Sequence, residues 1–66
     1  MKRNMIEEKI QASGLRMGYI LQELGLKHEA TFWKQLEAGT MTADRVRRLG
    51  QIFRLRPEEI HVLLAA

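Results

Sequence analysis

The spacing of apolar residues between Gly14, Gly25 and Gly39 most constrains the fold of this chain. Glycine readily adopts the left-handed conformation that commonly ends a helix. Between the first two glycines, four apolar residues recur at the i, i+3, i+4 and i+7 spacing of one helix face: Met17, Ile20, Leu21 and Leu24. No segment alternates with period two, as a half-buried strand would. The sequence therefore predicts an all-α fold of short helices.

The same reasoning predicts five helices in one compact bundle. Asn4, with Glu7 three residues later, matches a capping box and predicts the start of the first helix. The third helix is expected over about residues 28–38, Thr42 is expected to cap the fourth, and Pro57 to open the fifth. The expected inward positions outside the second helix are Met5 or Ile6, Ile10, Phe32, Trp33, Leu36, Ala43, Val46, Leu49, Gly50, Phe53, Ile60, Leu63 and Leu64.

Length and composition exclude several classes of protein. The 66 residues allow one domain, expected to span 1–66. The chain has no cysteine, which leaves no disulfide and no thiolate metal site. No apolar run approaches the ~20 residues of a membrane span, and no apolar core follows the basic N-terminus as in a signal peptide. We therefore expect a cytoplasmic protein with no membrane association.

The residues that often perform catalysis or bind metals are not spaced for that chemistry. His28 and His61 lie far apart in the sequence, with no acidic or cysteine partner at ligand spacing. Glu58 and Glu59 diverge by about 100° on a helix and cannot flank one substrate bond, so they are expected to stabilise the helix start. A chain this short leaves no room for a pocket. We expect no enzyme, no metal, no cofactor and no small-molecule ligand.

One face of the predicted third helix is polar, basic and free of acids. At about 100° per residue, Phe32, Trp33 and Leu36 share one arc. The opposite arc carries Lys27, His28, Thr31, Lys34 and Gln35. Glu29 and Glu37 are expected to point toward or beside the apolar arc. Because phosphates repel carboxylates and base edges need donors and acceptors, this pattern predicts a helix that lies in a DNA groove.

Net charge adds little to this prediction. Eleven Lys and Arg against eight Asp and Glu give +3 and a pI of about 9.8, and the placement of charges matters more than their sum. The basic side of the fourth helix, with Arg48, Gln51 and Arg54, is either solvated or meets an acidic partner protein. Trp33 is expected to be a core anchor rather than a base-stacking residue, and Tyr19 to lie at the edge of the second helix.

Three groups of residues follow one another in an order known from one family. Gly14-Leu15 followed by Gly25 matches the family's spacing across its second helix, and Leu36-Glu37-Ala38-Gly39 matches the end of its recognition helix. The closing pair of helices is matched by Leu49-Gly50, Phe53, Leu55, Pro57, Glu58, Glu59 and Ile60. Over Ile6 to Leu64 the chain thus resembles the Cro/CI-type repressors of phages, also called lambda-repressor-like or XRE-like.

This resemblance implies a sequence-specific double-stranded DNA-binding regulator of transcription, with a helix-turn-helix over about residues 16–39. Its third helix would enter the major groove, with base contacts from Thr31, Lys34, Gln35 and His28. Phosphate contacts are expected from Arg16, Lys27, Thr42 and Arg45. Arg16 and Met17 stand where the family has a small cap and a phosphate-binding glutamine, so Arg16 would replace that contact. The segment from Gly25 to Gly39 is about two residues longer than usual, and the turn after it about two shorter.

The partners implied are double-stranded DNA and a second copy of the chain. Because one module of this size is small, specificity would need a two-fold dimer on half-sites about one helical turn apart. Val62 and Leu64 are the dimer candidates, and use as a monomer beside another protein is the alternative. Two other functions remain open: a protein-interaction module that docks an acidic toxin or polymerase subunit, and an accessory factor that bends DNA for phage excision.

Overall fold

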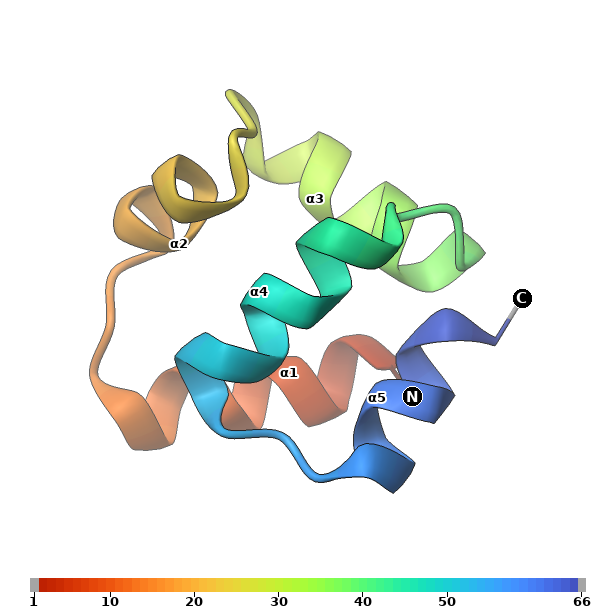
Figure 1. Cartoon of the computed structure of the whole chain (residues 1–66). Coiled ribbons are helices and arrows are strands. Elements are labelled where there is room, and N and C mark those ends of the chain that lie inside the picture. The colour runs from red at the N-terminus through yellow and green to blue at the C-terminus, as the bar shows by residue number, and fades with distance from the viewer. Residues whose placement is uncertain (1, 66) are drawn as a thin grey trace.

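The computed structural model describes residues 2–65, which form five α-helices (Figure 1). The helices are α1 (Lys2–Ser13), α2 (Met17–Leu24), α3 (Glu29–Ala38), α4 (Ala43–Phe53) and α5 (Pro57–Leu64). No strand occurs within the described range. The prediction of an all-α fold with five short helices is confirmed.

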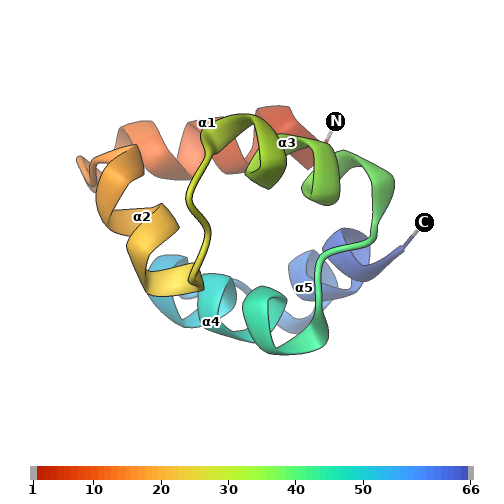
Figure 2. The ribbon, with the colours of Figure 1, turned by 90° about the horizontal axis from the view of Figure 1, so that it is seen from above.

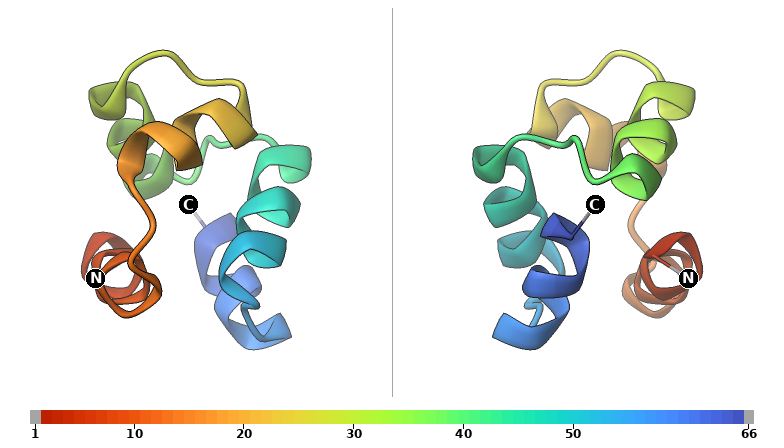
Figure 3. Two further views of the ribbon diagram at one scale, coloured as in Figure 1. Left: turned by 90° about the vertical axis from the view of Figure 1, so that its left-hand side faces the viewer. Right: turned by 90° about the vertical axis from the view of Figure 1, so that its right-hand side faces the viewer.

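The five helices surround one shared interior. Seen from above, α1 and α3 run along one side of the molecule, α4 and α5 along the other, and α2 closes one end (Figure 2). The two side views place α2 and α3 together at the top, with α1 and α5 below (Figure 3). The principal extents are 25 × 22 × 20 Å, so each helix can turn one side inward and another to solvent.

The core draws apolar side chains from every helix and from two loops. The buried residues are Ile6, Ile20, Leu24, Phe32, Trp33, Leu36, Met41, Val46, Leu49, Leu55 and Leu63. Phe32 and Trp33 meet edge to face, with ring centroids 4.8 Å apart. Two predicted inward positions are wrong. Ala43 is exposed because it lies in the first turn of α4, and Leu64 is 47% exposed because its neighbour Leu63 takes the interior position.

Most helix ends follow local sequence signals. Gly14, Gly25 and Gly39 end α1, α2 and α3 with φ of 71°, 72° and 70°. The Thr42 hydroxyl caps α4 by accepting a hydrogen bond from the Arg45 backbone N–H at 3.3 Å. Pro57 opens α5. These predicted boundaries are confirmed, and α3 begins at Glu29, one residue later than expected.

The predicted cap at Asn4 is wrong. Helix α1 already begins at Lys2, so Asn4 lies inside it. Glu7 pairs instead with Arg3 at 3.4 Å. A backbone N–H of the first turn, that of Arg3, donates to the Glu37 carboxylate of α3 at 2.9 Å. The acceptor that a local cap would supply therefore comes from a neighbouring helix.

Candidate nucleic-acid interface

The outward side of α3 and the loop before it carry the predicted DNA-contacting residues. Lys27, His28 and Lys34 are exposed, and Thr31 is half-buried. The apolar arc turns inward as predicted, since Phe32 and Leu36 are fully buried and Trp33 is 8% exposed. These four polar residues therefore reach solvent while the apolar arc of α3 faces the core.

Both carboxylates of α3 are held at the side of the helix. The Trp33 indole N–H donates to Glu29 at 3.0 Å, and Glu37 accepts from the Arg3 backbone N–H at 2.9 Å. The Arg3 guanidinium also lies 4.6 Å from the centroid of the Trp33 ring, a cation–π arrangement. The prediction that the acids point toward or beside the apolar arc agrees with these bonds, although both residues are exposed, and the outward arc itself carries no carboxylate.

Gln35 is less open than predicted. It is half-buried, and its side-chain oxygen is fully covered with no hydrogen-bond partner among the described residues. The physical reason is its place on the helix, three residues after Phe32 and next to Leu36. Lys34 lies farther around the helix and is exposed. The carbonyl oxygen of Gln35 is therefore not open to accept a hydrogen bond from a base, which leaves the amide nitrogen as its one polar group for such a contact.

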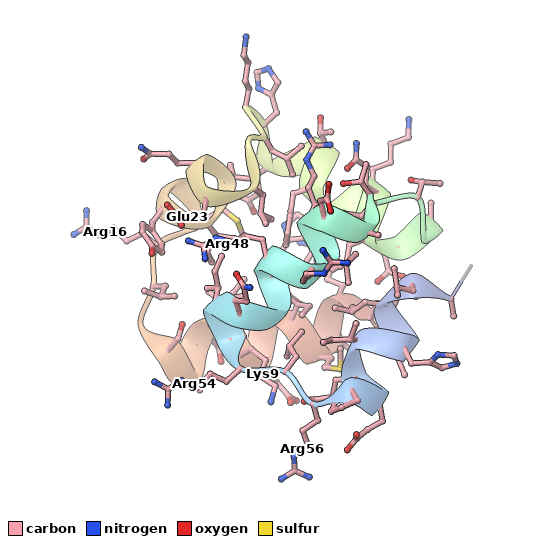
Figure 4. The ribbon with its side chains drawn as sticks, in the orientation of Figure 1. Lys9, Arg16, Glu23, Arg48, Arg54 and Arg56 are labelled. Atoms are coloured by element: carbon pink, nitrogen blue, oxygen red, sulfur yellow. The ribbon has the colours of Figure 1, made fainter. Side chains whose placement is uncertain are left out.

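The four predicted phosphate-binding residues divide into two pairs. Arg16 precedes α2 and points away from the body of the molecule (Figure 4), and Lys27 is exposed in the loop before α3. Thr42 and Arg45 instead have structural partners. The Thr42 hydroxyl caps α4, and the Arg45 Nε donates to the Leu24 carbonyl at the end of α2 at 2.9 Å.

Arginines of α4 attach this helix to α2, which sequence reasoning missed. Besides Arg45, Arg48 pairs with Glu23, and Figure 4 shows the two side chains pointing toward each other. Arg48 also donates to Gln51 at 3.1 Å. No local pattern indicates the two bonds to α2, because Leu24 and Glu23 lie more than twenty residues from Arg45 and Arg48 in the sequence. The bond to Gln51, in contrast, has the i, i+3 spacing of neighbours on one helix.

The start of α5 holds a carboxyl group whose pKa is shifted by its surroundings. A hydrogen bond from the Arg56 backbone N–H at 2.9 Å holds the pKa of Glu59 below its ordinary value. The Lys9 ammonium, 3.2 Å away, acts in the same direction, whereas desolvation opposes it. Glu59 thus acts as a helix-start charge, as predicted.

Three large apolar residues are exposed on the surface. Val62, Leu64 and Tyr19 are each 47% exposed. Among residues 2–65, no group of three His, Cys, Asp or Glu side chains is placed to hold a metal ion.

The expectation that the chain leaves no room for a pocket is wrong, because a shallow pocket of about 240 Å³ lies between the ends of α1 and α4. Such a pocket depends on how far apart two helices pack, which periodicity does not specify.

No helix in the described part of the chain is long and apolar enough to cross a membrane. Comparison of the chain with protein-family models, with curated protein sequences and with solved structures finds no match.

Proposed function

We propose that this protein is a cytoplasmic, sequence-specific double-stranded DNA-binding regulator of transcription, of the lambda-repressor-like helix-turn-helix type. In this proposal α2 and α3 are the helix-turn-helix, and α3 enters the major groove. One observation carries it: Glu29 and Glu37 are bonded at the side of α3, which leaves an outward arc with basic and hydrogen-bonding groups and no carboxylate.

The dimensions of α3 suit a major groove. Its ten residues span about 15 Å, and the groove, about 12 Å wide, admits one α-helix. Lys34 would donate to acceptors on a base edge such as guanine O6 or N7. Gln35 would donate through its amide nitrogen, since its oxygen is covered. Thr31 and His28 would contact neighbouring bases.

Cations around α3 would bind the phosphates. Arg16 and Lys27 are exposed on either side of α2, and Arg45 is anchored through its Nε, which leaves its two terminal nitrogens for a phosphate. Thr42, which already caps α4, would add a hydroxyl contact. Three cationic contacts predict that log K falls with log salt concentration with a slope of about −2.7.

The same proposal includes a two-fold dimer. Val62 and Leu64 expose apolar surface at the end of α5, where a second copy would bury it. Two copies would place two α3 helices in successive major grooves about one helical turn apart.

Selection of bound sequences from a random duplex pool, at physiological salt, tests this proposal. We expect one preferred sequence, and a palindromic one if the dimer forms. Lys34→Ala should weaken binding to that sequence by about 1–3 kcal/mol, or roughly fivefold to 150-fold, with an unchanged melting temperature. Gln35→Ala should act in the same direction. Arg54→Gly removes one positive charge from the other side of the molecule and serves as the matched control.

Two outcomes would contradict the proposal. One is a pool in which no sequence is enriched. The other is equal binding by Lys34→Ala, Gln35→Ala and the parent protein.

A further inference from the structure

A pocket opens between the C-terminal halves of α1 and α4, away from the outward arc of α3. Its volume is about 240 Å³, and it is lined by Lys9, Ala12, Ser13, Ile52, Phe53 and Arg54. Figure 4 shows Arg54 at the lower left and Lys9 at the lower centre, whereas α3 lies at the top of the same view. A DNA duplex bound along α3 would leave this pocket accessible.

The pocket combines an apolar floor with a cationic rim. Ile52 and Phe53 are half-buried and pack against the core, so their outer parts form the floor. On the rim, Lys9 is paired with Glu59 at 3.2 Å. Arg54 is exposed and forms no ion pair with any residue of the described range. One positive charge therefore stands at the pocket without a counter-charge.

The backbone of Arg54 does not favour an arginine. It has φ 53° and ψ 50°, the left-handed conformation, at the C-terminal end of α4. Glycine takes the corresponding place after α1, α2 and α3. Because an L-residue is strained in this conformation and glycine is not, glycine would suit the turn better. The arginine side chain is thus present at the pocket although the turn itself does not need it.

These features define the chemistry of a ligand. The pocket is smaller than the roughly 300–1,000 Å³ of typical small-molecule sites, and it has room for one large apolar side chain. A carboxylate beside that side chain would pair with Arg54 through charge-assisted hydrogen bonds. A duplex fits less well, because a phosphate backbone has no apolar group to cover the apolar floor.

We propose that this pocket docks a short acidic segment of another protein. An apolar side chain of the segment enters over Ile52 and Phe53, and a neighbouring carboxylate binds Arg54. The site lies apart from the α3 surface, so docking does not depend on DNA binding, and a partner can be held while α3 contacts a duplex.

The probe is a seven-residue synthetic peptide with one central phenylalanine flanked by Asp and Glu. Titrated into ¹⁵N-labelled protein, it should shift the backbone amide signals of Ala12, Ser13, Phe53 and Arg54 and leave those of α3 unchanged. A peptide with Asn and Gln in place of the acids, and one with Ala in place of phenylalanine, should each bind more weakly.

Three variants of the protein test which residues the peptide contacts. Arg54→Gly should weaken peptide binding at least about threefold, the effect of losing one exposed ion pair, while the melting temperature stays equal or rises. Ala12→Glu, at an exposed helical position on the rim, should abolish binding by repelling the peptide's acids. Lys34→Ala removes an equal charge from the α3 surface and should bind the peptide as the parent does.

Three results would overturn docking at this pocket while leaving the DNA proposal intact. Arg54→Gly could bind the peptide as well as the parent protein does. The shifts could spread to Lys27 and Lys34, which would indicate general charge attraction. A random-sequence duplex could shift the pocket residues as strongly as the peptide, which would identify a nucleic-acid surface instead.

Discussion

Glu29 accepts a hydrogen bond from the indole nitrogen of Trp33, one turn along the same helix, at 3.0 Å. This bond satisfies the polar atom of a buried aromatic residue and turns a carboxylate of α3 toward the side that packs on α1. Arg3 of α1 lies over the same Trp33 ring. The acid-free surface of α3 therefore depends on a bond made at the edge of the core.

Glu29→Ala should lower the free energy of unfolding by about 1–2 kcal/mol. It leaves the partly buried indole N–H without its partner and removes a favourable charge from the first turn of α3. Glu29→Gln keeps an acceptor oxygen and should lose less. Urea titrations of the three proteins measure the difference, and equal losses in the two variants would mean that the bond to Trp33 contributes nothing.

Trp33→Ala should remove about half or more of the free energy of unfolding. Replacing a buried Trp with Ala costs about 3–5 kcal/mol, and a domain of this length has only about 3–10 kcal/mol in total. Trp33→Phe should remain folded with a lower melting temperature. Circular dichroism follows both. A folded Trp33→Ala protein that has lost only DNA binding would show that Trp33 acts in recognition rather than in the core.

Arg45 should contribute to stability and to phosphate binding through different nitrogens. Arg45→Ala should destabilise the fold by about 1 kcal/mol, because the Leu24 carbonyl loses its donor, and reduce the magnitude of the salt slope of DNA binding by about one. Arg45→Lys keeps the charge but not the Nε donor, so it should keep the slope and lose the stability. Denaturant unfolding and binding titrations at several salt concentrations test both effects. An unchanged slope in Arg45→Ala would remove this residue from the phosphate contacts.

Glu59 should make stability depend on pH in the acid range. Because hydrogen bonding to Arg56 lowers the pKa of Glu59 in the folded state, its stabilising effect is present above the ordinary pKa of 4.5 and is lost as the pH falls below it. The melting temperatures of the parent and of Glu59→Gln should therefore differ at pH 7 and converge toward pH 3. A constant difference over this range would contradict the assignment.

The residues of α3 show which side-chain positions can be predicted from helix periodicity alone. Periodicity placed Lys34 outside and Phe32 inside, and both placements are confirmed, because the angle around a helix follows directly from residue number. The same rule placed Gln35 with Lys34. Gln35 in fact lies three residues after Phe32, at the border of the two arcs, and its side-chain oxygen is covered in the folded chain.

The sequence alone determined the elements of this protein: five helices, three of them ended by glycines, a Thr42 cap on α4, and the apolar faces that turn inward. Those features depend on groups within about one turn of each other, so local chemistry is sufficient. Only the tertiary structure decided the bonds between helices: Glu37 as the acceptor for the start of α1, Arg45 as a donor to the end of α2, and the pocket beside Arg54. Each requires two segments that are distant in sequence to meet at a particular distance and rotation, which depend on how the whole core packs.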